Sequence, residues 1–291
     1  MSFAWAFIVL LFIACTNDDN LLSGDGENVS FTFHPVLCGA SGTRAIGDAT
    51  GIDRLQVVVY EDNGTSLSKK FSLSETWTEA QRYGITLTLI EGRKYKILFW
   101  ADDEDNLAYD FTVDGKVSVD YTSYIGGGFA KMEEMDAFCA TSSIKVGAQK
   151  VENKGEIKLS RPFAQLNFAD NATQPVTGTH KTVVTFHSIP TSFNPFSGEV
   201  EMSSTSDIAF TFTDFPTEPL SANGLTYYYL SSNYLFAPQE GTVKVSATID
   251  LQNIDGTSIK TVELSEITLE KNKKTNVTGS IVQQLDAKSI F

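Results

Sequence analysis

The 291-residue sequence has few of the residues that build catalytic and metal centres, with three histidines and three cysteines in all. His34, His180 and His187 form none of the close spacings, such as His-x-x-x-His, that bind a catalytic zinc ion. No Gly-x-Ser-x-Gly, Gly-x-x-x-x-Gly-Lys or Cys-x-x-Cys motif occurs. We therefore predict a protein that is not an enzyme and needs no cofactor or metal. A pair of Asp or Glu side chains brought together by the fold would leave no such motif, so a carboxylate enzyme stays open.

Positive charge is also scarce. The 22 Lys and Arg residues stand against 36 Asp and Glu residues, which gives a formal net charge of −14 at pH 7. An excess of negative charge repels nucleic acids and anionic membrane surfaces, so we expect no nucleic acid partner. Beyond the N-terminus no apolar run reaches the roughly 18 residues that span a bilayer. Any membrane attachment is therefore expected at the N-terminal end.

Apolar and aromatic residues are plentiful. Hydrophobic residues make up 42% of the chain, including 20 Phe and 10 Tyr. This composition is typical of a packed globular protein, and its aromatic share favours strands. The length is sufficient for about two domains of common size.

The N-terminus combines an apolar run with a cysteine. Ala4 to Ile13 is an unbroken run of ten apolar residues, which suits the core of a signal peptide and is too short to span a membrane. The order Leu11-Phe12-Ile13-Ala14-Cys15 resembles a bacterial lipobox, in which the chain is cut before a cysteine that carries diacylglycerol. We predict a signal peptide over residues 1–14 and a lipid on Cys15. The alternative is a buried cysteine in an ordinary helix.

Cys38 and Cys139 remain once Cys15 is lipidated. A disulfide between them would suit an exported protein, but the fold would have to bring their Cα atoms within about 7 Å. We expect two unlinked, partly buried thiols instead.

From Asn28 onward, short apolar-patterned runs alternate with turn residues, which is typical of an all-β sandwich protein. Val29, Phe31 and Phe33 alternate with polar residues and predict a strand with one apolar face. Further strands are predicted at residues 55–60, 85–90, 95–100, 111–113, 117–119, 183–186 and 242–251. A fresh patterned strand begins after Arg161-Pro162, so we place a domain boundary near residue 160.

Several phrases of the sequence resemble the fimbrillin family of Bacteroidetes, the subunits of type V pili. They are Gly42-Thr43-Arg44-Ala45, Lys96–Ala101 with Asp136-Ala137-Phe138, Arg161–Asn167 and Lys274–Gly279. Their order and spacing carry the resemblance, since each phrase alone is short. The resemblance implies two tandem transthyretin-like β-sandwich domains, over residues 45–160 and 161–291, preceded by a lipidated segment over residues 15–44.

The resemblance also implies assembly by strand exchange. In that family the first strand is a placeholder that leaves after cleavage beyond an arginine, and a strand of a neighbouring subunit replaces it. Here the placeholder would be the strand of Val29, Phe31 and Phe33, and the cut would fall between Arg44 and Ala45, in a loop of small residues. The alternative for Arg44 is an ordinary surface arginine.

The candidate donor strand is the C-terminal segment, where Val277, Ile281 and Leu285 share one face by period two. That face is only half apolar. The alternative is the last strand of the second domain followed by a frayed end. Whether the chain serves as a stalk, tip or anchor subunit stays open.

Two further patterns resemble binding sites. The acidic loop of residues 102–106 has the oxygen ligands that calcium prefers, but Ala108 stands where a calcium loop needs glycine, so a solvated loop is the preferred interpretation. Aromatic residues at Trp77, Trp100 and Tyr227–Tyr229 would stack on sugars in a surface lipoprotein that binds glycans, although core packing is the preferred interpretation.

The main prediction is a fimbrial subunit or cell-surface adhesin precursor, located in the outer membrane or in a fimbrium. Its expected partners are other pilin subunits, outer-membrane lipid through Cys15, and a host or bacterial surface ligand. Glycan binding is the alternative function.

Overall fold

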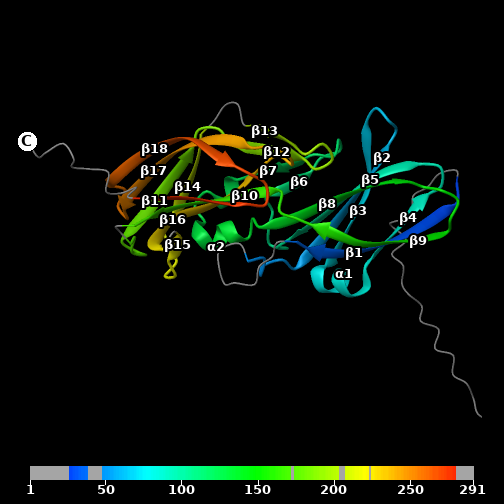
Figure 1. The fold of residues 1–291 in the computed structure, drawn as a ribbon, viewed down its shortest axis with the longest axis horizontal. Coiled ribbons are helices and arrows are strands. Elements are labelled where there is room, and N and C mark those ends of the chain that lie inside the picture. Colours follow the sequence, from blue (N-terminus) through cyan, green and yellow to red (C-terminus); the bar gives the residue numbers. More distant parts are fainter. Residues whose placement is uncertain (1–25, 39–47, 172–173, 203–206, 223, 280–291) are drawn as a thin grey trace, which may run out of the picture.

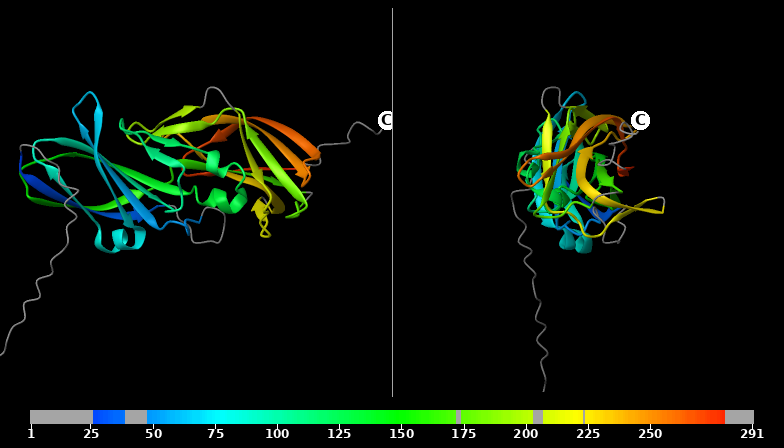
Figure 2. Two further views of the ribbon diagram at one scale, coloured as in Figure 1. Left: turned by 180° about the vertical axis from the view of Figure 1, so that it is seen from behind. Right: turned by 90° about the vertical axis from the view of Figure 1, so that its left-hand side faces the viewer.

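The computed structural model describes residues 26–38, 48–171, 174–202, 207–222 and 224–279 (Figure 1). Almost all regular structure in them is β-strand, so the prediction of an all-β protein is confirmed. The strands form two layered lobes that lie end to end along the long axis of the molecule (Figures 1 and 2).

The first lobe is a sandwich of two sheets, with the strand orders β4-β1-β9 and β3-β2-β5-β8. Its strands are β1 (Asn28–Leu37), β2 (Arg54–Asp62), β3 (Leu67–Thr76), β4 (Ile85–Ile90), β5 (Lys94–Asp102), β8 (Ala137–Lys145) and β9 (Val151–Leu159). The short helix α1 (Trp77–Tyr83) connects β3 to β4 and contacts β1.

The second lobe is also a sandwich, with the strand orders β15-β16-β10-β19 and β14-β11-β17-β18. Its strands are β10 (Phe163–Asp170), β11 (His180–Phe186), β14 (Ile208–Phe212), β15 (Leu220–Ala222), β16 (Leu225–Phe236), β17 (Val243–Asn253), β18 (Ser258–Leu269) and β19 (Lys274–Gly279). The last described strand, β19, pairs in parallel with β10.

A small sheet of order β13-β12-β7-β6 joins the two halves of the chain. It consists of β6 (Tyr109–Phe111), β7 (Val117–Val119), β12 (Pro190–Asn194) and β13 (Glu199–Met202). The connection from β7 to β8 holds the 3₁₀ turn η2 (Thr122–Tyr124) and the helix α2 (Gly128–Glu133), which contacts β14 and β16. Because β7 pairs with β12, backbone pairing crosses the proposed boundary near residue 160, and independent folding of the two halves stays a prediction.

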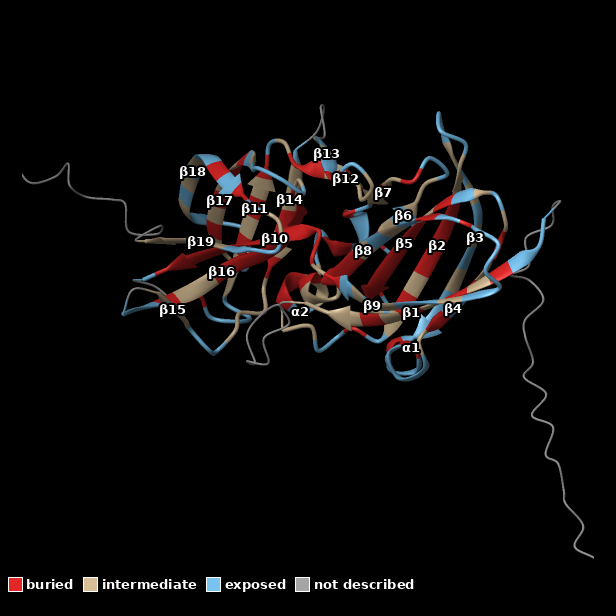
Figure 3. Ribbon diagram, turned by 45° about the vertical axis from the view of Figure 1, so that its right-hand side comes forward, coloured by how far each residue is buried: buried red, intermediate tan, exposed pale blue. Residues whose placement is uncertain are grey.

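The sheet β3-β2-β5-β8 explains the continuous apolar runs of the sequence, because its two central strands are buried on both faces (Figure 3). Successive side chains of a strand point to opposite faces of its sheet. One face contributes Val57, Val59, Ile97 and Phe99 to the core of the first lobe, and the other contributes Val58, Tyr60, Leu98 and Trp100 to the core that continues into the second lobe. A strand buried on both sides reads as an unbroken apolar run.

A buried ion pair fastens the end of the first half to the start of the second. Arg161 Nε and Nη2 donate to the two carboxylate oxygens of Asp136, each at 2.6 Å. The guanidinium carbon also lies 4.4 Å from the ring centre of Phe138. Burial raises the pKa of Asp136 above its usual value, and the hydrogen bonds from Arg161 oppose that rise. A buried charge depends on its partner because the desolvation cost remains when the partner is removed.

We therefore predict that Asp136→Ala lowers the free energy of unfolding by about 3–5 kcal/mol, because it leaves the buried guanidinium without its carboxylate. Urea unfolding followed by tryptophan fluorescence measures this loss. Glu27→Ala is the control: Glu27 and Lys150 form an exposed pair at 3.9 Å, and its loss should change stability by less than about 0.5 kcal/mol. Equal effects of the two substitutions would contradict the role assigned to the buried pair.

Candidate functional site

The candidate site is the place that the first strand, β1, occupies between β4 and β9 in the three-stranded sheet, and it is called the seat of β1 below. On one side β1 pairs antiparallel with β4, from Asn28↔Ile90 to Phe33↔Ile85. On the other side it pairs in parallel with β9, from Ser30↔Val151 to Leu37↔Leu159. Among the described strands, β4 has no other ladder partner, and β9 has only the isolated bridge between Cys139 and the next residue, Ser160. The two neighbours of β1 therefore depend on it for their backbone hydrogen bonds.

The inward side chains of β1 fill part of the core of the first lobe. Val29, Phe31 and Phe33 are exposed by only 1%, 0% and 2%, which agrees with the alternation read from the sequence. The ring centres of Phe33 and Phe99 lie 5.0 Å apart. Burying such side chains contributes roughly 1.5 to 3 kcal/mol each, so β1 is a substantial part of this core.

The ring of Phe31 is covered by a cation. Lys154 Nζ, from β9, lies 5.1 Å from the ring centre. Glu152, on the same strand, accepts a hydrogen bond from that ammonium group at 2.5 Å. A cation over an aromatic face is attracted by the ring quadrupole, so this contact favours an aromatic side chain at the position of Phe31.

Two glycines shape the seat. Gly155, at φ 72°, lies opposite Phe33, where the pairing of β1 with β9 shifts by one residue. Gly84, at φ 76°, follows α1, and a Cβ atom there would lie 2.7 Å from the carbonyl oxygen of Phe33 and 2.9 Å from the imidazole of His34. The backbone of β1 thus approaches Gly84 too closely for any side chain.

Most of the residues predicted for lipidation, cleavage and strand donation lie outside the described residues. These are Cys15, Arg44, Ala45, Ile281 and Leu285. Arg44 and Ala45 belong to the connection between β1 and β2.

Val277 of the predicted donor face is described. It lies in β19, opposite Phe168 of β10, and packs against the core of the second lobe. At least this part of the predicted donor segment serves as the last described strand of its own lobe. The donor role itself stays a prediction.

The two described cysteines are not linked, as the sequence analysis expected. The backbone N–H of Cys38 donates to the carbonyl of Leu159 at 2.7 Å, and Cys139 exchanges two backbone hydrogen bonds with Ser160. Burial raises the pKa of the Cys139 thiol to about 11, so it stays a protonated core side chain at neutral pH.

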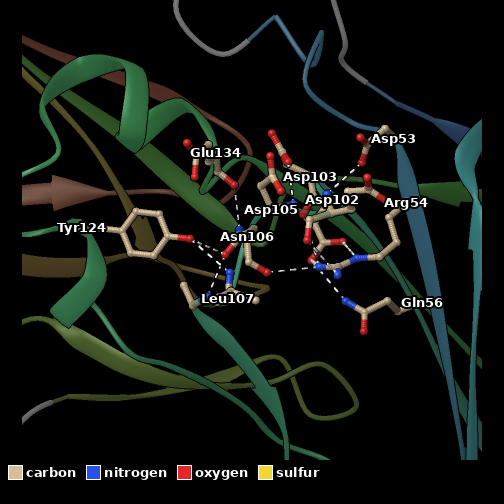
Figure 4. A network of polar contacts seen from close by, with 12 residues as sticks. Asp53, Arg54, Gln56, Asp102, Asp103, Asp105, Asn106, Leu107, Tyr124 and Glu134 are labelled. Atoms are coloured by element: carbon tan, nitrogen blue, oxygen red, sulfur yellow. Dashed lines mark hydrogen bonds and ion pairs between the residues drawn. The ribbon is translucent and has the colours of Figure 1, made fainter.

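The acidic loop of residues 102–106 is held by protein donors (Figure 4). Arg54 Nε and Nη2 donate to the two carboxylate oxygens of Asp102 at 2.8 and 2.9 Å, and Gln56 donates to the same group at 3.2 Å. The backbone N–H of Glu104 donates to Asp53 at 2.8 Å. Nowhere in the described ranges do three or more His, Cys, Asp or Glu side chains gather in a way that could hold a metal ion.

The aromatic residues considered for glycan binding are mostly core residues. Trp100 is fully buried and Trp77 is exposed by 7%. Trp100 packs edge-on against Tyr109, Phe111 and Phe163. Neither tryptophan presents an open ring face of the kind on which a sugar could stack.

No helix in the described part of the chain is long and apolar enough to cross a membrane.

Comparisons with known proteins give a family and a fold. The profile of a family of unknown function, DUF6562, matches residues 23–290. A search of curated protein sequences gives no match.

Among solved structures, a candidate adhesin from Bacteroides ovatus is similar with a TM-score of 0.50 and 11% identity, over 86% of this chain and 88% of that chain. A candidate polysaccharide-binding protein from Bacteroides thetaiotaomicron has a TM-score of 0.49 and 11% identity, over 81% and 79%. The fimbrial anchor protein Mfa2 from Porphyromonas gingivalis has a TM-score of 0.47 and 10% identity, over 82% and 83%. The first of these similarities confirms, as a likeness of fold, the resemblance to Bacteroidetes fimbrial proteins stated from the sequence.

The close approach of the β1 backbone to Gly84 leads to a prediction about how firmly β1 is held in its sheet. Gly84→Ala should speed amide hydrogen exchange throughout β1 and lower stability by about 1–3 kcal/mol, because the new Cβ strains the backbone and pushes against Phe33. Gly92→Ala is the matched control, since Gly92 has a similar φ of 81° with nothing within 4 Å of its Cβ position. Mass spectrometry of the exchanged peptides measures both. Equal acceleration of amide exchange in β1 by Gly92→Ala and Gly84→Ala would show that contact between Gly84 and β1 does not hold the strand.

The buried Asp102, which Arg54 holds in the acidic loop, leads to a prediction about how stability depends on pH. Burial raises the pKa of Asp102 from 3.8 to about 6, against the opposing hydrogen bond from Arg54. A carboxyl group that binds its proton more tightly in the folded state adds stability below its unfolded pKa, and that stability is lost as the pH rises through the folded pKa. The stability of the wild type relative to Asp102→Asn should therefore fall between pH 4 and 6.5. Urea unfolding at several pH values measures this difference, and a difference that grows with pH would contradict the expected direction.

Proposed function

The chain belongs to DUF6562, a family of unknown function, and we propose that it is a fimbrial subunit or cell-surface adhesin precursor that assembles by β-strand exchange. It would act by binding and assembly, without catalysis. Its partners would be other pilin subunits, outer-membrane lipid, and a ligand on a host or bacterial surface.

The observation that carries the proposal is the double pairing of β1. If β1 left its sheet, β4 and β9 would each lose their ladder partner at once, and the core would lose Val29, Phe31 and Phe33. Unpaired backbone groups and an open apolar groove both favour a replacement strand. A groove of this kind binds a new strand through main-chain hydrogen bonds, and its pockets select the alternate side chains.

The proposed cleavage after Arg44 fits the place of β1 in the chain. The cut falls in the connection between β1 and β2, so it would free one end of β1 without interrupting a described strand. Arg54 is a poorer target because it starts β2 and its guanidinium is bound to Asp102. After the cut, β1 would be held only by its own contacts, and a competing strand could displace it.

The proposed lipid anchor lies on the same side of the cut as β1. Cys15 precedes Asn28, the first residue of β1, by thirteen residues, a tether that spans about 45 Å at most. Cleavage after Arg44 would therefore leave lipid and placeholder strand together in one fragment. The rest of the chain would become free of the membrane when a new strand replaces β1.

The glycan-binding alternative gains no specific support from the structure. Of its candidate residues, Trp77, Trp100 and Tyr227 are core side chains, and Tyr228 and Tyr229 are half-buried. We therefore keep assembly as the proposed function.

The test is controlled cleavage followed by strand replacement. We predict that limited trypsin treatment cuts first after Arg44, so that N-terminal sequencing of the large fragment begins at Ala45. The cut protein should then take up a fluorescent peptide of residues 28–37, seen as fluorescence that co-elutes with the protein. Uncut protein and Arg44→Ala should take up none, because the tether keeps β1 in its seat. A protein verified as cut that never exchanges its strand would refute the assembly mechanism.

A further inference from the structure

We propose that the seat of β1 selects a donor strand with aromatic side chains at two alternate positions, a pattern that residues 277–291 of a second copy do not carry. The inference rests on the proposed strand exchange and goes beyond it by stating the chemistry of the partner. It follows from the side chains that β1 places in the groove.

The groove has two aromatic sites in succession. At the first, Phe31 lies opposite Leu87 and under the ammonium of Lys154. At the second, Phe33 lies opposite Ile85 and against the ring of Phe99. Both rings are buried, so a side chain of another size or polarity cannot turn outward without leaving its site empty.

Smaller and polar side chains fit these sites badly. The cluster around Phe31 and Phe33 consists of hydrophobic side chains, with Val57, Val59 and Ile97 among them. A small residue would leave a cavity, which costs several kcal/mol where a phenylalanine is lost. Burying an amide or hydroxyl group among these apolar side chains also costs free energy that burying a phenyl ring does not.

The backbone of the seat also sets the length of the donor strand. A replacement strand in the register of β1 runs parallel to β9 and antiparallel to β4, with eight paired positions along β9 from Ser30 to Leu37. Within that frame, the positions of Val29, Phe31 and Phe33 call for an aliphatic residue followed by two aromatic residues, each separated by one residue. This pattern is the signature expected of the donor.

Residues 277–291 of this chain do not carry the pattern. On one face it reads Val277, Gly279, Ile281, Gln283, Leu285, Ala287, Ser289 and Phe291, and on the other Thr278, Ser280, Val282, Gln284, Asp286, Lys288 and Ile290. Its sole aromatic residue is the last one. Every register therefore puts a glycine, alanine or polar residue at one or both aromatic sites. Val277 is also already packed in its own lobe.

The experiment compares how tightly three peptides bind in the place of β1. The chain from residue 15, with Cys15→Ser and a specific protease site in place of residues 40–46, is cut and mixed with a labelled peptide in mild urea. The three peptides are residues 28–37, the same sequence with Phe31→Ala and Phe33→Ala, and residues 279–291. Binding is measured by fluorescence anisotropy in competition with the resident strand.

We expect the 28–37 peptide to bind at least about 100-fold more tightly than the other two, in line with the cost of losing buried phenylalanines. Equal binding of the 279–291 peptide would overturn the inference and leave strand exchange intact, with copies of this chain as donors. Failure of the 28–37 peptide to bind would instead overturn the proposed function.

A variant of Lys154 tests whether its ammonium group contributes to the preference for an aromatic residue at position 31. With Lys154→Ala, the preference of the seat for Phe over Leu at position 31 of the peptide should fall about threefold, since the contact between ammonium and ring is lost. Lys158→Ala, on the same strand and exposed, is the control and should leave the preference unchanged. An unchanged preference in Lys154→Ala would remove Lys154 from the selection of the donor.

Discussion

Backbone N–H and C=O groups that are removed from water need partners, and in the first lobe this requirement makes β4 and β9 depend on β1. Within the described residues, neither strand has another ladder partner, so the three-stranded sheet exists only while its central position is filled. Four residues of the same strand, Val29, Phe31, Phe33 and Pro35, are buried. Main-chain pairing and core packing therefore act together at one strand, and this coupling is what the proposed strand replacement would use.

The rest of the molecule is tied together in ways that do not involve β1. The sheet β3-β2-β5-β8 is apolar on both faces and so belongs to two cores at once. The pairing of β7 with β12 and the ion pair of Asp136 with Arg161 add backbone and charged links between the halves. A lobe that loses its central strand would thus keep a facing sheet that is supported from behind by the second lobe.

Three of the phrases on which the family resemblance rests lie side by side: Asp136–Phe138, Arg161–Asn167 and Lys274–Gly279. Asp136 and Phe138 both contact Arg161, which opens the next phrase. The strand that follows, β10, pairs with β19, where Asn167 Nδ2 donates to Asn276 at 2.8 Å. Three stretches that are far apart in the chain therefore form one junction. Their order and spacing in the sequence therefore correspond to contacts in the structure, since Arg161–Asn167 binds both of the other stretches.

The sequence by itself determined the all-β class and the alternation of Val29, Phe31 and Phe33, because period-two patterns and turn residues act locally. The unlinked state of Cys38 and Cys139 was decided by the tertiary structure, since it depends on where the fold places the two side chains. The sequence did not reveal that the runs at 55–60 and 95–100 serve two cores, nor that Lys154 covers Phe31 and Gly84 limits the approach of β1. Only the tertiary structure decided these points. They depend on which strands become neighbours, and contacts between residues so far apart in the chain leave no periodic signal along it.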